Sequence, residues 1–132
     1  MSLTKVSNET EAEIAQFFQK RVRERIIYEL SSKKRAEVFN KLAHTAEDYI
    51  DCRLIVEKRP RPFEPTELKK RLGKTVYVMA YNSGSDGDFA ELDAVLNELW
   101  SCGTPYMLYG NGFLYLETEY DFSVHTTYLL KR

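Results

Sequence analysis

The residues best placed for chemistry lie in YNSGSDGDFAEL (81–92), which joins a strand-like segment to a helix-like one. Its glycines permit a turn whose backbone N–H groups face a phosphate, but no Walker lysine follows, and Asp86 and Asp88 would repel the anion. The carboxylates suit a cation better, although their spacing is not that of a helix–loop–helix calcium site. The simplest interpretation is a connection in which Asp88 caps a helix and Glu91 completes a capping box.

His44, Asp48 and Cys52 are residue types that bind metals, and their spacing of four would align them on a continuous helix. Thr45 resembles a helix cap and Cys52 begins a strand-like run, so we expect no common face. Cys52 is then a small buried hydrophobic residue. His44 and Cys52 remain secondary metal candidates, and no metal is predicted.

Glu119 and His125 flank the turn YDFSV and form the candidate catalytic pair. A carboxylate that faces an imidazole orients it and raises its pKa, which general acid–base catalysis requires. An ordinary cross-strand pair is the simpler interpretation. The chain contains no GxSxG, HExxH or GxxxxGK[ST] motif, so we expect no cofactor and favour a protein that is not an enzyme.

The charge of the chain is divided between its two halves, although the net charge is −1. Residues 1–74 hold 17 Lys and Arg against 12 Asp and Glu, whereas residues 75–132 hold 2 against 8. The second part also contains 11 of the 17 aromatic residues. Such asymmetry is typical of a binding face, or of a sheet-rich half that carries few lysines.

Hydrophobic periodicity predicts a first helix that ends near residue 30 and a second helix after Ser31-Ser32, followed by a short turn through Ile50 that Thr45 could cap. Strands are then expected at 52–57 and 75–81, with a short helix that begins at Pro65 between them. A helix over 88–101, a hairpin around GNG and a final strand complete the chain. We therefore predict an α/β (mixed α+β) fold, with two N-terminal helices followed by a five-stranded mixed sheet in the order β-α-β-α-β-β-β.

Two strand–helix–strand crossovers would make the first three strands parallel, and ligands of open α/β sheets bind beyond the carboxyl ends of such strands. The loops RPRPF, NSGSDGD and GNG would converge at that edge. The predicted binding residues are those that this topology places near the edge: Tyr81, Asp86, Asp88, Tyr109 and Asn111.

A chain of 132 residues fits a single domain, with a helical part (1–51) and a sheet part (52–132). No apolar run approaches the roughly 18 residues of a membrane helix, and the polar start is not a secretory signal. Two cysteines without a framework indicate a reducing, cytoplasmic setting.

The first functional hypothesis is a non-catalytic protein-interaction or regulatory domain, whose acidic, aromatic-rich C-terminal face binds a basic protein partner or a second copy of the chain. The second hypothesis is a small hydrolase or transferase with a cleft at one sheet edge. The third is nucleic-acid binding through the basic N-terminal helices. It is disfavoured because Glu24, Glu29 and Glu37 are interspersed among the basic residues.

Overall fold

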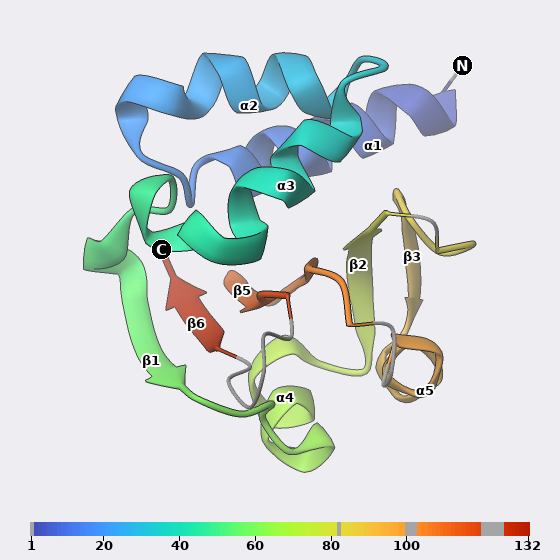
Figure 1. Cartoon of the computed structure of the whole chain (residues 1–132). Helices are drawn as coiled ribbons and strands as arrows, with labels where there is room; N and C mark the ends of the chain where they lie inside the picture. Colours follow the sequence, from blue (N-terminus) through green and yellow to red (C-terminus); the bar gives the residue numbers. More distant parts are fainter. Residues whose placement is uncertain (1, 82, 100–102, 120–125) are drawn as a thin grey trace.

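A six-stranded antiparallel sheet forms the centre of the computed structural model, which describes residues 2–81, 83–99, 103–119 and 126–132, with side chains from residue 9 onward (Figure 1). The spatial order is β1-β6-β5-β4-β2-β3. The strands are β1 (Ile55–Arg59), β2 (Thr75–Ala80), β3 (Asp88–Glu91), β4 (Tyr106–Gly110), β5 (Phe113–Glu117) and β6 (Thr127–Lys131).

Helices cover both faces of this sheet (Figure 1). One layer consists of α1 (Ser2–Ala15), α2 (Arg23–Leu30) and α3 (Arg35–Thr45), and the other of α4 (Pro65–Leu72) and α5 (Leu92–Leu99). A hydrophobic core lies on each side of the sheet, one against α1–α3 and the other against α4 and α5. Successive strand residues face opposite sides of a sheet, so on β5 Leu114 and Leu116 lie in the α1–α3 core and Tyr115 lies in the α4–α5 core. Short 3-10 turns at Lys20–Val22, Ala46–Asp48 and Cys52–Leu54 connect the helices to one another and to β1.

The mixed α+β fold is confirmed, but the five-stranded mixed sheet with parallel crossovers is wrong. All strand pairs are antiparallel, and the extra strand is β3, in the region where we expected a helix. Gly87, at φ 78°, donates its N–H to the Val78 carbonyl (2.8 Å), which folds the segment back onto β2. Pairing with β2 therefore supplies backbone partners for residues 88–91, and the helix begins only at Leu92.

The predicted convergence of three loops at one sheet edge is also wrong. Among the strands that the structure describes, β1 pairs with β6 alone, so α4 carries the chain from one side of the sheet to the other. β2 and β4 are neighbours but run in opposite directions, with Ala80 opposite Tyr106. Asn111 follows Tyr106 by five residues, which corresponds to about 17 Å along the sheet.

The first predicted helix is interrupted after Ala15 because the next residues bond to a distant segment. Gln19 donates its backbone N–H to Tyr49 O, and Asp51 donates to Phe17 O, both at 2.8 Å. These bonds replace the helical ones and attach the N-terminal layer to the entry of β1. The GNG hairpin is confirmed: Asn111 and Gly112 have φ of 52° and 77°, as expected for a type I′ turn.

Gly110 lets the end of α4 lie directly against β4. A Cβ atom added at Gly110 would lie 2.3 Å from the Leu72 carbonyl oxygen, closer than any real contact. The absence of a side chain therefore sets how closely α4, and the basic residues at its end, approach the β4–β5 turn.

We predict that Gly110→Ala lowers the free energy of unfolding by about 1–3 kcal/mol, because the added methyl group must displace the backbone of α4. The matched control is Gly84→Ala, whose Cβ would meet nothing within 4 Å and should change stability by less than about 0.5 kcal/mol. Urea denaturation of both variants is the measurement. Equal stability of the two would show that α4 adjusts without strain.

Candidate functional site

Two exposed aromatic side chains mark the side of the sheet that ends in β3. Tyr81 and Phe89 are 49% and 52% exposed, although both contact buried rings. Phe89 lies opposite Tyr77 on the neighbouring strand with ring centroids 5.1 Å apart, and Tyr81 contacts Phe39 of α3 at 6.3 Å. Their inner surfaces are packed while their outer surfaces remain open to a ligand.

β3 is an edge strand with an unpaired side. Within the described residues it pairs with β2 alone. The Phe89 N–H donates to the carboxylate of the preceding residue, Asp88, at 2.9 Å. Backbone N–H groups along an antiparallel strand point alternately toward and away from the paired strand, and this N–H points away from β2, to the open side. Asp88 and Glu91 are exposed beside it. The edge combines an unpaired side of a strand, aromatic surface and carboxylates. We call Tyr81, Asp88, Phe89 and Glu91 the β3-edge surface.

A largely buried ionic network lies next to the β3-edge surface in the chain, at Asp86. Arg35 donates to both carboxylate oxygens of Glu11 (2.9 and 2.7 Å) and to both of Asp86 (2.9 and 3.1 Å). Tyr77 donates its hydroxyl to Glu11 at 2.7 Å, and the Ala80 N–H donates to Asp86 at 2.9 Å. Burial by itself would lower the pKa of Arg35, but the two carboxylates outweigh burial and raise it. The guanidinium therefore stays charged and holds α1, α3 and the loop after β2 together.

The predicted binding residues are consequently split between two places. Tyr81, Asp86 and Asp88 lie at the β3 side, and there the Asp86 carboxylate is already engaged by Arg35. Tyr109 and Asn111 lie at the opposite end of β4. The Tyr109 hydroxyl donates to Glu13 at 2.9 Å, and burial, followed by the Glu13 carboxylate, raises its pKa.

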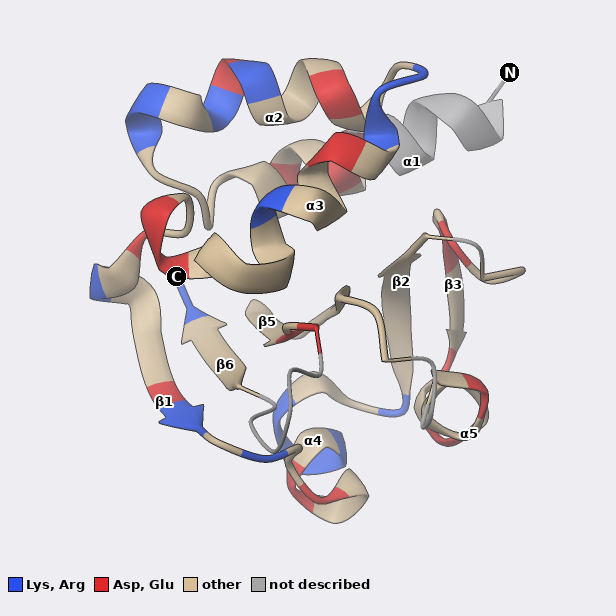
Figure 2. Ribbon diagram, viewed as in Figure 1, with Lys and Arg blue, Asp and Glu red and all other residues tan. Residues whose placement is uncertain are grey.

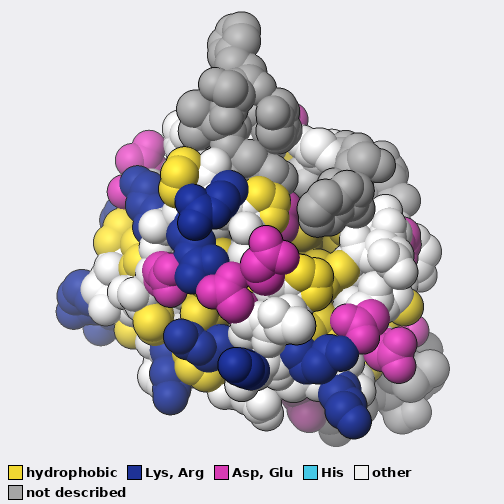
Figure 3. Space-filling model, turned by 90° about the horizontal axis from the view of Figure 1, so that it is seen from below, with side chains coloured by type: hydrophobic (Ala, Val, Ile, Leu, Met, Phe, Trp, Pro, Cys, Tyr) yellow, Lys and Arg dark blue, Asp and Glu magenta, His cyan; other side chains and the backbone are white. Residues whose placement is uncertain are grey.

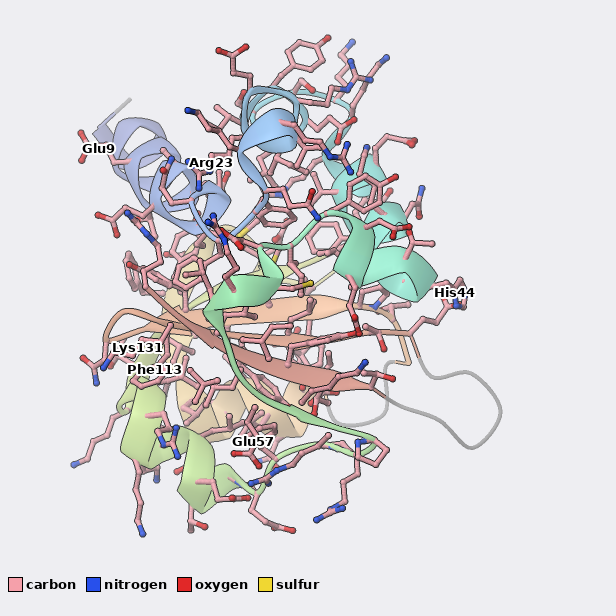
Figure 4. The ribbon with its side chains drawn as sticks, turned by 90° about the vertical axis from the view of Figure 1, so that its left-hand side faces the viewer. Glu9, Arg23, His44, Glu57, Phe113 and Lys131 are labelled. Carbon is pink, nitrogen blue, oxygen red and sulfur yellow. The ribbon has the colours of Figure 1, made fainter. Side chains whose placement is uncertain are left out.

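A cavity of about 420 Å³ lies between the end of α3 and the strands β5 and β6. His44 Nε2 lies 2.9 Å from a Glu119 carboxylate oxygen at this cavity, and Figure 4 shows His44 projecting at the end of the helical layer. We expected Glu119 to face His125, which lies outside the described residues. No local motif joins residue 44 to residue 119, so only the packing of α3 on the sheet identifies this pair.

Glu47 and Tyr128 form a second polar pair that lines the same cavity. Tyr128 donates its hydroxyl to the Glu47 carboxylate at 2.7 Å, and Lys58 also binds that carboxylate. These hydrogen bonds, Lys58 first, lower the pKa of Glu47. The carboxylate therefore remains charged and paired, which is a structural role.

The His44–Asp48–Cys52 helix face does not form, because α3 ends at Thr45 and Cys52 lies in a separate turn. Among the described residues no group of three or more His, Cys, Asp or Glu side chains is arranged to hold a metal ion. The expectation that Cys52 is buried is wrong: the residue is exposed. Partial desolvation of the thiol, with the carboxylates of Glu47 and Asp51, raises the pKa of Cys52, so it is a poor nucleophile.

Comparison of the chain with protein-family models, curated proteins and solved structures finds no match. Across the part of the chain that the structure describes, no helix is both long enough and apolar enough to cross a bilayer. Any functional conclusion therefore depends on the geometry of the surfaces described above.

We predict that Arg35→Gln lowers the free energy of unfolding by about 3 kcal/mol, because it leaves Glu11 and Asp86 without their cation in a largely buried setting. Lys33→Gln is the control, since Lys33 is exposed in the preceding loop and its loss should cost less than about 0.5 kcal/mol. Thermal and urea unfolding measure both. If the Arg35→Gln variant were as stable as the control, solvent would already screen the network.

Proposed function

We propose that the protein is a non-catalytic interaction domain that binds a basic protein partner through the β3-edge surface. The observation that supports this most directly is that two half-exposed aromatic rings, those of Tyr81 and Phe89, lie beside a strand edge that has no partner strand among the described residues. An extended segment added to such an edge gains main-chain hydrogen bonds, while side-chain contacts give specificity. Tyr and Phe are good anchors because they bury a large area at little cost in rotamer entropy.

The charge of the β3-edge surface favours a basic partner. Asp88 and Glu91 are exposed on β3, and no described lysine or arginine forms an ion pair with either of them. Carboxylates at the rim of an interface steer an oppositely charged partner and suppress the binding of others. Asp86 is not part of this proposal as a contact, since it belongs to the Arg35 network.

We predict that a photo-crosslinking amino acid at position 89 captures a specific protein in lysate from the source cells, whereas the same group at Tyr28 does not. Tyr28 is the matched control because it is equally exposed, at 52%, but lies on α2. Capture at position 89 should fall about tenfold when Asp88→Lys and Glu91→Lys are introduced, because rim charges of the wrong sign repel the partner.

Two results decide the outcome: which protein is captured, and whether its capture depends on the charges of Asp88 and Glu91. A basic protein captured at position 89 alone, and lost in the charge-reversal variant, would support the proposal. A crosslinked dimer of the chain itself would identify self-association through β3 instead. Equal capture at positions 28 and 89, or no effect of charge reversal, would remove the β3-edge surface from consideration.

A second candidate function is hydrolysis or group transfer at the cavity beside α3. It is favoured by the His44–Glu119 contact of 2.9 Å, since a carboxylate orients an imidazole for general-base catalysis. This candidate predicts that His44→Gln reduces ester hydrolysis, measured with 4-nitrophenyl acetate, by about 100-fold or more. Equal rates for the wild type and the variant would eliminate it, and Lys33→Gln again serves as the control.

A further inference from the structure

The cations of the N-terminal helices are mostly engaged within the protein. Arg23 donates to the Phe18 and Gln16 carbonyls, Arg25 pairs with Glu29, and Lys41 pairs with the same buried carboxylate. Figure 2 shows that basic and acidic residues alternate along these helices. These side chains are therefore poorly placed to neutralise a second, external anion.

A different set of cations lies near the end of α4, the start of β5 and the end of β6. Lys70, Arg71, Lys74 and Lys131 are exposed, and no ion pair is found for them among the described residues. Figure 3 shows Lys and Arg side chains on the face that carries α4, with both hydrophobic and acidic side chains among them. We call these four cations, together with Phe113, the α4-end surface.

Tertiary packing holds this surface together. The close approach of Leu72 to Gly110 places the end of α4 against the β4–β5 turn. Phe113 lies directly opposite Lys131 in the register of β5 and β6. Figure 4 shows these two residues next to each other at the end of the sheet. Arg71 of α4 and Lys131 of β6, which are 60 residues apart in the chain, thus lie over the same aromatic ring.

Phe113 gives this surface an aromatic element among the charges. Its ring is partly buried against the α4–α5 core, with Lys131 Nζ 4.9 Å and Arg71 Cζ 5.8 Å from the ring centroid. Three carboxylates in this layer are already engaged: Arg59 binds those of Glu57 and Glu67, and Lys69 binds that of Asp93, so they compete little for the four cations.

We propose that the α4-end surface binds single-stranded nucleic acid. Four unpaired cations can follow the phosphates of a flexible strand, and an aromatic ring among them offers a stacking platform for a base. Polyglutamate would use the cations but has no aromatic ring to stack on Phe113. This surface carries the opposite charge to the β3-edge surface, which it adjoins where the Lys74 carbonyl accepts the Leu92 N–H beside Glu91.

The probe is a fluorescein-labelled 12-nucleotide oligo(dT), titrated with the full chain at several salt concentrations. Neutralisation of about four phosphates predicts a log–log salt slope of about −3. The double variant Lys70→Glu, Lys74→Glu should weaken binding about tenfold or more. Lys33→Glu, Lys34→Glu makes the same change in net charge on the α2–α3 loop and should have a much smaller effect.

The contribution of Phe113 separates nucleic acid from other polyanions. Phe113→Leu should weaken oligo(dT) binding roughly tenfold but leave the binding of inorganic polyphosphate unchanged, and Phe113→Tyr should retain both. Circular dichroism and thermal unfolding show whether each variant remains folded. Equal effects of the two lysine pairs, no effect of Phe113→Leu on oligo(dT), or equally tight binding of poly-glutamate would each overturn the proposal.

Discussion

The charged guanidinium of Arg35 joins the parts of this protein that the backbone alone does not connect. It binds a carboxylate from α1 and another from the loop after β2, and Tyr77 of β2 binds the first of these. The helical layer, the sheet and the entry to β3 are thereby held in one arrangement. Arg35, Glu11 and Asp86 are largely removed from water, so each charge is stabilised by the others. Loss of one leaves an uncompensated charge in a largely buried setting, which destabilises the fold.

The same network accounts for the position of the proposed binding surface. Asp86 turns inward to Arg35 and accepts the Ala80 N–H, so the loop after β2 is held at its start while Gly87 bonds back to Val78. The chain must then return along β2, and Asp88 and Phe89 become part of an edge strand. Carboxylates that are close in the sequence therefore have opposite roles: one stabilises the fold and the other faces outward.

The two proposed surfaces illustrate how folding redistributes charge. The N-terminal half has an excess of cations, yet most of those on α2 and α3 are used in ion pairs or bonded to backbone carbonyls. The C-terminal half is acidic, yet Lys131 lies over the same aromatic ring as Arg71 of α4. A binding surface is determined by which charges remain unpaired after packing, and a count along the chain does not measure this.

Local patterns in the sequence determined the elements whose signals are local. The GNG turn, the apolar run of β2, Pro65 at the start of α4 and the period of α3 each follow from backbone preference or hydrophobic spacing over a few residues. Only the tertiary structure decided the direction of the strands, the identity of β3 and the partners of Arg35, His44 and Phe113. These features depend on contacts between residues many positions apart, of which the local sequence carries no signal. At residues 88–91, for example, the free energy of pairing with β2 exceeds a weak local preference for helix.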